Sequence, residues 1–478
     1  MSESLKQKTA KGVLWSAVEQ FSVQIIQFVL GLIMARILSP HDYGLVGMIL
    51  VFTSIAETFV NSGFSNALIR KQNKTEVDYS TAFYFNIVVG LVAYFILFFL
   101  SPFIARFYNE PLLELLTKAI SINVFINSLG IVQRARYSIK VDFKTQAKAT
   151  TTSVLISGII GIWMAYSGYG VWAIVWQSVI RNALNVLLLW IFAKWLPQLQ
   201  FSWHSFCEMW SFGYKLLLSG LLDTIYRDIY QLIIGKVFSA QDLGNYTRAK
   251  QFANFPSANF TGIIGRVTYP ILSSIQDDDA RLEHVYRKYL RLSAFIVFPL
   301  MVGLSALAEP LIISILTEKW RAAIILLQVI CFGMMWYPIH AINLNLLQVK
   351  GRSDLFLKLE IIKKIIGVTI LCITVPIGLV AMCIGGIFSS IICLAVNTYY
   401  TGKLINVGFW LQMRDLLPTL LLSLAMGVVV FLSVMFFSSN IVKLFVGVVV
   451  GVVFYIGVAY LFKMEEISDL LSLVKRKK

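Results

Sequence analysis

Several ionisable side chains lie deep inside long apolar segments of this chain. Arg181, Arg227 and Glu57 each fall near the middle of such a segment, too far from its ends for the side chain to reach water easily. A charge near the centre of a bilayer costs several kcal/mol, so it faces protein or a water-filled cavity and marks a candidate functional site. Guanidinium groups gathered in a cavity would bind an anion such as a diphosphate, because their N–H donors match its oxygen atoms.

The segment 211–238 carries a polar stripe on one face of an expected helix. The stripe comprises Lys215, Ser219, Asp223, Arg227 and Gln231. Residues four apart lie on the same face of a helix, so the stripe is expected to line a cavity. The alternative is that Asp223 and Arg227 neutralise one another within the helix.

The next segment, 243–273, places Arg248, Asn259 and Arg266 on one face. The two arginines lie about 27 Å apart along a helix axis, so together they could pass an anion across the membrane. Alternatively, each extends its charge to the nearer membrane surface.

These positions form two candidate sets. The substrate-binding set is Arg181, Lys215, Arg227, Arg248 and Arg266. The ion-coupling or cavity polar set is Glu19, Gln24, Glu57, Asn61 and Asp223. Arg181 has a second interpretation as a structural partner of Glu57 or Glu19. A carboxylate that binds H⁺ or Na⁺ would couple the cycle to an ion gradient, whereas export of an anion from a negative-inside cell is driven by the membrane potential itself.

The composition excludes a large soluble domain. Of the 478 residues, 58% are hydrophobic, against about 45–50% in soluble proteins. The 5 cysteines and 4 histidines are scattered without metal-ligand spacing, and no phosphate-binding GxxxxGK[ST] motif occurs. We therefore expect an all-α polytopic membrane protein with no catalytic residues, metal, cofactor or nucleic-acid partner.

Hydropathy predicts about 14 transmembrane helices. They are expected at 12–38, 43–69, 80–104, 113–133, 149–167, 169–194, 211–238, 243–273, 291–316, 321–349, 357–376, 378–401, 416–438 and 441–462. The predicted organisation is an N-terminal six-helix lobe (1–205), a second six-helix lobe (206–403), and two further helices with a basic tail (404–478). The basic start is interpreted as part of a retained first span rather than a cleaved signal peptide.

Lys and Arg, which give the chain a net charge of +16, are concentrated in alternate loops. Cytoplasmic loops are enriched in these residues, so both termini are expected in the cytoplasm. The region 134–148 is assigned to one of these cytoplasmic loops. The protein is therefore predicted to be a multi-pass protein of a bacterial inner membrane, with membrane lipids around it.

An internal repeat supports the two lobes. ARILSPHDYG (35–44) aligns with GKVFSAQDLG (235–244), each copy lying between the first and second helix of a lobe. Within the repeat, Ser39 and Ser239 are expected to cap the following helix, with Asp42 and Asp242 three residues later. Transporters built from repeats place substrate between the halves.

Four patterns, KGVLWSAVEQF, ARILSPHDYG, GFSNALIRK and VKGRSD, resemble those of the polysaccharide transporter family. These O-antigen and exopolysaccharide flippases (Wzx-type) belong to the multidrug/oligosaccharidyl-lipid/polysaccharide exporter superfamily. The resemblance implies two six-helix lobes around a central cavity. It also implies export of a polyprenyl-diphosphate-linked oligosaccharide from the cytoplasmic to the periplasmic leaflet, in lipopolysaccharide or exopolysaccharide synthesis. An upstream glycosyltransferase and a downstream polymerase are then the expected partners.

In such flippases, cavity arginines on helices one, two and eight hold the diphosphate. Here helix eight supplies Arg248 and Arg266, whereas helices one and two offer Glu19 and Glu57. The alternatives are a multidrug exporter of the same superfamily, a passive scramblase, and an integral-membrane polymerase or glycosyltransferase. The last would require a long periplasmic loop, which the predicted spans do not leave.

Overall fold

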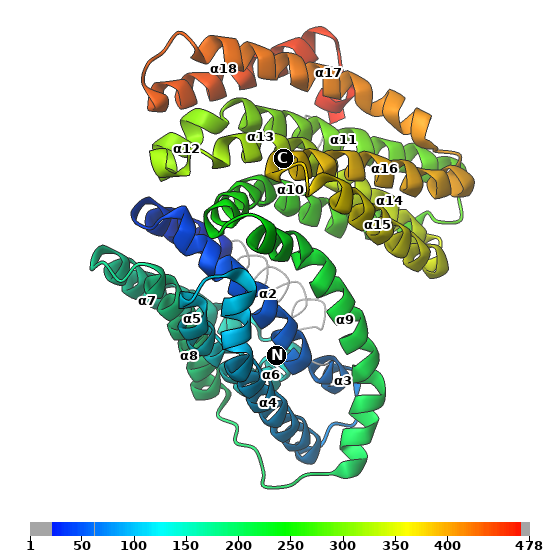
Figure 1. Ribbon diagram of the computed structural model, residues 1–478. Coiled ribbons are helices and arrows are strands. Elements are labelled where there is room, and N and C mark those ends of the chain that lie inside the picture. Colours follow the sequence, from blue (N-terminus) through cyan, green and yellow to red (C-terminus); the bar gives the residue numbers. More distant parts are fainter. Residues whose placement is uncertain (1–21, 62, 470–478) are drawn as a thin grey trace, which may run out of the picture. The chain divides into compact units, whose positions relative to one another are not determined.

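The computed structural model describes residues 22–61 and 63–469, and Figure 1 shows long helices joined by short connections. No strand occurs in these two ranges. Ten helices within them are long and apolar enough to cross a membrane. The predicted all-α polytopic class is therefore confirmed, and the chain is a multi-pass membrane protein.

Contacts divide the chain into two compact units, Met1–Gly244 and Asn245–Lys478. Unit 1 contains Ser22–Ile37, α2 (Pro40–Asn61), α3 (Phe64–Arg70), α4 (Glu76–Tyr108), α5 (Leu112–Ile120), α6 (Ile122–Lys140), α7 (Phe143–Tyr166), α8 (Val171–Ala193), α9 (Trp203–Val237) and the start of α10 (Ala240–Ser274). Unit 2 contains the rest of α10, α11 (Asp279–Ala306), α12 (Ala308–Leu316), the short η1 (Glu318–Trp320), α13 (Ala323–Met334), α14 (Tyr337–Val349), α15 (Ser353–Thr374), α16 (Leu379–Ile405), α17 (Phe409–Val434) and α18 (Asn440–Leu461).

The two units are defined by packing, whereas the predicted lobes are defined by topology. Helix α9 packs against α2, α3 and α4, so it belongs to unit 1 although it opens the second predicted lobe. The lobe boundaries at 205 and 403 stay a prediction.

Three predicted spans form helices that are more polar than the ten apolar ones. They are α9 and α10, each 35 residues long, and the 22-residue α15. The polar stripe of α9 and the arginines of α10 lower the hydropathy of those helices. Helices of this composition are suited to line a polar space rather than to face lipid on every side.

The predicted span 113–133 is divided into α5 and α6, and α6 ends later than the sequence predicted. The expected span ended at 133, but the helix continues to Lys140, where Val141 ends it with a positive φ of 57°. The assignment of 134–148 to a loop was therefore wrong for its first residues. Arg134 and Arg136 lie within the helix, whose last turns pack through Ala135 against α3 and through Tyr137 against Leu189 of α8.

The two copies of the internal repeat have the same local structure. Ser39 Oγ accepts a hydrogen bond from the Asp42 backbone N–H (3.3 Å), and Ser239 Oγ accepts one from the Asp242 backbone N–H (3.0 Å). The predicted capping arrangement is confirmed. The copies also contact one another within unit 1, where a side chain on Gly44 would overlap the Ala240 carbonyl.

The contact is reciprocal. A side chain on Gly244 would overlap the Pro40 carbonyl, just as one on Gly44 would overlap Ala240. The starts of α2 and α10 therefore touch backbone to backbone, which requires a residue without Cβ at both positions. This contact explains why each copy of the repeat ends in glycine.

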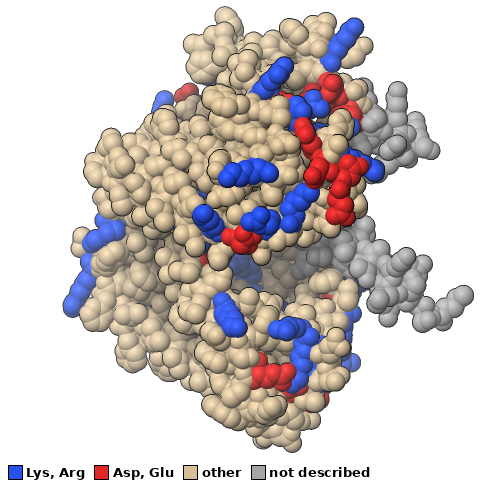
Figure 2. All heavy atoms as spheres, turned by 90° about the vertical axis from the view of Figure 1, so that its right-hand side faces the viewer, with Lys and Arg blue, Asp and Glu red and all other residues tan. Residues whose placement is uncertain are grey.

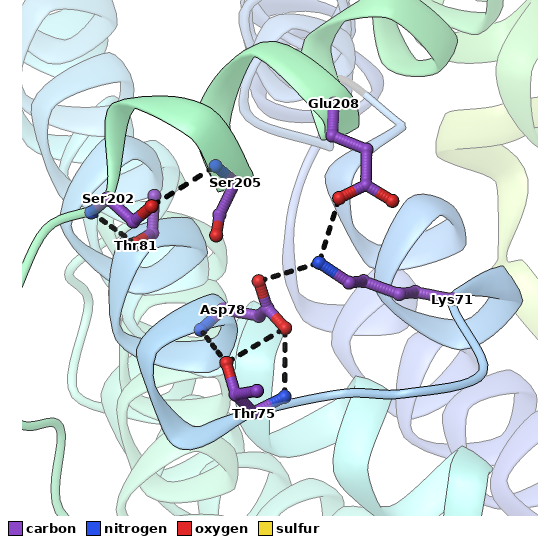
Figure 3. Close-up of polar contacts among 7 residues, drawn as sticks. All are labelled: Lys71, Thr75, Asp78, Thr81, Ser202, Ser205 and Glu208. Atoms are coloured by element: carbon purple, nitrogen blue, oxygen red, sulfur yellow. Dashed lines mark hydrogen bonds and ion pairs between the residues drawn. The ribbon is translucent and has the colours of Figure 1, made fainter.

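A polar cluster fixes the start of α9 against α3 and α4 (Figure 3). Lys71 Nζ lies between Asp78 Oδ1 (2.9 Å) and Glu208 Oε2 (2.8 Å). Thr75 and Asp78 form a capping box that begins α4. Asp78 is buried, so its charge is compensated by these hydrogen bonds.

Unit 2 has a buried hydrogen-bond network around Gln412 of α17. Its side-chain nitrogen donates to Asn343 Oδ1 (3.1 Å), Thr401 Oγ1 (3.1 Å) and the Tyr286 hydroxyl (3.3 Å). These residues come from α14, α16 and α11, and all four are buried. The network therefore aligns four helices of unit 2 through satisfied polar groups.

Large apolar side chains face outward along the spans, as a lipid environment requires. Phe99 of α4, Ile159 of α7 and Phe445 of α18 are exposed by 68%, 66% and 73%. In the view of Figure 2 most of the surface carries no charge, and the Asp and Glu side chains lie beside Lys and Arg side chains. The protein therefore offers wide uncharged surfaces to the hydrocarbon core.

Candidate anion-binding site

Unit 1 contains a polar cavity of about 450 Å³. It is lined by Gln27, Arg134, Gln146, Thr150, Val154, Arg181, Asn182, Asn185 and Leu189. These residues come from the shorter apolar helix Ser22–Ile37 and from α6, α7 and α8, which lie in helices long and apolar enough to cross a membrane. Val154 and Leu189 are the apolar members of the lining, so the wall is mostly amide, hydroxyl and guanidinium.

Arg134 is held against its own helix. Its NH2 group donates to the Asn127 carbonyl oxygen (3.1 Å) and lies 3.4 Å from Asn127 Oδ1. A Cβ on Gly130 would lie 3.1 Å from the same NH2 group, so the glycine leaves room for this position. Gln146 of α7 donates to the Arg134 carbonyl (3.3 Å), which links the two helices beside the cavity.

Arg181 is bound less tightly. Its side chain makes no hydrogen bond or ion pair with any residue that the structure describes, although it interacts electrostatically with Glu57. It lies twelve residues before the end of α8, about 18 Å along the axis at the usual helical rise. The guanidinium therefore stands near the middle of a span with its donors available to a ligand.

Glu57 of α2 balances part of this positive charge. Its carboxylate accepts a hydrogen bond from Asn127 Nδ2 (3.0 Å), and both Arg134 and Arg181 act on it electrostatically. Asn127 therefore connects the carboxylate to Arg134. Arg181 acts on Glu57 electrostatically without an ion pair, and the structure adds Arg134 to the same group.

The cluster has two guanidinium groups and one carboxylate among the described residues, which leaves one positive charge uncompensated. In a membrane-embedded cavity, such a charge attracts an anion strongly because the surroundings screen it poorly. The amides and Thr150 add donors and acceptors for a polar ligand. The arrangement can bind an anionic polar group.

The stripe on α9 has exposed members and lies beside a buried carboxylate. Asp228, beside the stripe, accepts from the Ser54 hydroxyl (2.7 Å) and pairs with Arg227 Nε (3.4 Å). The side chain of Arg227 is 67% exposed, so one side of this guanidinium is open. Lys215 and Asp223 are also exposed. Arg227 therefore pairs with the adjacent Asp228, and its i, i+4 pairing with Asp223 stays a prediction.

The two arginines of α10 differ in burial. Arg248 is buried, donates to Gln251 Oε1 and lies over the Trp320 ring, 5.8 Å from its centre. Arg266 is exposed. The packing of Arg248 gives it a structural contact within unit 2, and the substrate roles of both arginines stay predictions.

The polar candidates Gln24 and Asn61 differ in burial, and neither belongs to the cavity lining. Glu19 lies outside the described residues. Gln24 is half-buried, whereas Asn61 is exposed. Gln27, one turn after Gln24, lines it instead.

Sequence analysis missed most of the cavity lining. Arg134 was assigned to a loop, and the neutral members Gln146, Asn182 and Asn185 carry no charge that would mark them. The available signal was the recurrence of Arg181 and Asn185 at i, i+4 on one helix face. The contribution of α7 depends on packing and has no such signal.

Comparison with known proteins gives a family match and distant relatives. The family model described as "Polysaccharide biosynthesis protein" matches residues 33–325. The chain is 26% identical to the lipopolysaccharide biosynthesis protein WzxC of Escherichia coli (strain K12), over 89% of each chain. It is also 26% identical to the teichuronic acid biosynthesis protein TuaB of Bacillus subtilis (strain 168), over 74% of this chain and 73% of that one.

A third relative is the succinoglycan biosynthesis transport protein ExoT of Rhizobium meliloti (strain 1021), 22% identical over 68% of this chain and 66% of that one. Among solved structures, the lipid II flippase MurJ in an inward closed conformation matches with a TM-score of 0.78 at 15% identity, covering 95% of this chain and all of that one. An inward-facing multidrug resistance MATE family transporter matches with a TM-score of 0.60 at 13% identity, over 82% and 100% of the chains. These likenesses establish the fold, and the names agree with a transporter rather than an enzyme.

Proposed function

Because the chain belongs to the polysaccharide biosynthesis protein family, we propose that it carries a polyprenyl-diphosphate-linked oligosaccharide across the membrane. The resemblance inferred from the sequence motifs is confirmed by this membership. Movement runs from the cytoplasmic to the periplasmic leaflet of a bacterial inner membrane, by alternating access. The substrate is used in the synthesis of a cell-surface polysaccharide.

The observation that carries the proposal is the cationic cavity within the spans of unit 1. The proposed substrate is anionic, and Arg134 and Arg181 supply guanidinium donors that match phosphate or carboxylate oxygens. A polar cavity within a membrane span is a candidate binding site for a polar group that enters the membrane. The names of WzxC, ExoT and MurJ, a biosynthesis protein, a transport protein and a flippase, support the same activity.

Charge placement supports export as the direction of transport. The cavity extends from the level of Arg181 toward Leu189 near the end of α8, the end that the distribution of Lys and Arg assigns to the cytoplasm. A substrate made by a cytoplasmic glycosyltransferase would enter there, and a periplasmic polymerase would use the product.

Export of a negative charge from a negative-inside cell releases about 2.3 kcal/mol per charge at 100 mV. The membrane potential alone then drives the cycle, with no cofactor. H⁺ or Na⁺ coupling at Glu57 or Asp223 is the alternative. A transport assay in vesicles with a clamped potential and no ion gradient distinguishes the two driving forces. A carrier coupled to H⁺ or Na⁺ would show no net transport under these conditions.

Native mass spectrometry of the purified protein tests the proposed substrate. Wild type should retain a polyprenyl-diphosphate oligosaccharide and bind a lipophilic cation weakly. The variants Arg134→Ala, Arg227→Ala and Arg266→Ala each test whether that arginine contributes to binding of the lipid. Arg136→Ala is the matched control, because Arg136 lies on α6 but pairs with Glu76 outside the cavity. Preference for the cation would instead identify a drug exporter.

A further inference from the structure

The lining of the unit 1 cavity is richer in amides than a phosphate site requires. Gln27 and Asn182 make no side-chain hydrogen bond to any residue within the described ranges, and both line the cavity. An amide presents both donors and an acceptor, whereas phosphate oxygens only accept from it. Unused amide acceptors match the hydroxyl groups of a sugar, which donate as well as accept.

The lining of the cavity is too polar to bind a lipid tail. Val154 and Leu189 are its apolar residues, and the rest of the lining is polar. Its volume of about 450 Å³ falls within the range of about 300–1,000 Å³ that holds small organic ligands. A sugar unit therefore fits the chemistry and the volume, while a polyprenyl chain fits neither.

One charge in the cavity needs an anionic partner. Arg181 has no hydrogen bond or ion pair with the described residues, and Glu57 offsets only one of the two guanidinium groups. A planar carboxylate matches a guanidinium in two parallel hydrogen bonds. A sugar that carries a carboxylate would satisfy both the amides and Arg181.

We propose that this cavity recognises an acidic sugar of the lipid-linked oligosaccharide, with Arg181 binding the sugar carboxylate and Gln27, Asn182 and Asn185 binding its hydroxyl groups. The inference rests on the proposed function and makes it more specific. It assigns the diphosphate to a different place from the sugar. Selection for acidic oligosaccharides then occurs inside unit 1.

Three lipids test the assignment: a polyprenyl diphosphate carrying one glucuronic acid, the same lipid carrying glucose, and the bare polyprenyl diphosphate. Wild type should bind the glucuronic acid lipid about 10- to 100-fold more tightly than the glucose lipid, the range expected for hydrogen bonds to a charged group. Arg181→Ala should remove this preference and leave the affinity for the bare diphosphate unchanged. Arg136→Ala should keep the preference.

Arg181→Lys guards against loss of folding, because it keeps the charge and should retain part of the preference. Each variant is compared with wild type by size-exclusion elution and thermal unfolding. An equal loss of all three lipids in Arg181→Ala would place the diphosphate in the cavity and overturn the acidic-sugar assignment, while the flippase function stands. Equal binding of both sugars by wild type, or an unchanged preference in Arg181→Ala, would also overturn it. If wild type bound none of the three lipids, the proposed function itself would fail.

Discussion

Replacing Asn127 by leucine should destabilise unit 1 through the charged groups that this residue connects. Asn127 Nδ2 donates to the Glu57 carboxylate at 3.0 Å, and its Oδ1 lies 3.4 Å from Arg134 NH2. Leucine has a similar volume but keeps only the backbone carbonyl as an acceptor for Arg134. Two side-chain contacts with charged partners are lost in a region with little water.

A hydrogen bond to a charged group contributes about 1.5–3 kcal/mol. The contact with Glu57 has good geometry and should account for most of that amount, whereas the 3.4 Å contact is long and adds less. We expect Asn127→Leu to lower the free energy of unfolding by about 2–4 kcal/mol. Denaturant titration of the purified protein in detergent micelles measures this change.

A double-mutant cycle with Glu57→Gln tests the cause. If Asn127 acts on the Glu57 charge, removal of that charge makes the leucine substitution less costly, by about 1–2 kcal/mol in the cycle. Effects of the two substitutions that add within about 0.5 kcal/mol would show that the residues are independent. That result, or a cost of Asn127→Leu below about 0.5 kcal/mol, would refute the reasoning.

Three other outcomes follow from the packing. Gly44→Ala should reduce the yield of folded protein, because its Cβ would overlap the Ala240 carbonyl. Gly262→Ala is the control, since nothing lies within 4 Å of a Cβ at that position. Equal yields of the two variants, measured by fluorescence-detected size exclusion, would contradict the backbone contact. Gln412→Leu should cost at least about 2 kcal/mol in a denaturant titration, because Asn343 and Thr401 lose partners in a buried site, and an unchanged midpoint would argue against the network. Burial alone would lower the pKa of Lys71, but its hydrogen bonds with Glu208 and Asp78 outweigh burial and raise it. Its contribution is therefore complete below the ordinary lysine pKa of about 10.4 and is lost as the pH rises through the higher folded-state value, so wild type but not Lys71→Met should lose thermal stability in that range.

Much of the fold could be predicted from local composition. A helix that crosses a membrane must satisfy its own backbone and present apolar side chains over its length, so hydropathy located the spans. The Ser39–Asp42 and Ser239–Asp242 caps depend on residues three apart, and their pattern was visible for the same reason. The prediction ended α6 too early because Arg134 and Arg136 resemble loop residues when their partners are unknown.

The sequence by itself determined that the chain is a multi-pass membrane protein with expensive charges inside its spans, because hydropathy and charge are properties of single residues. The tertiary structure decided which of those charges meet. Arg134, Arg181 and Glu57 lie on α6, α8 and α2, and only the packing of these helices brings both arginines to one polar cavity and Glu57 within electrostatic reach of them. That packing depends on contacts between residues far apart in the sequence, such as Glu57 with Asn127, 70 positions later, for which a single sequence carries no local signal.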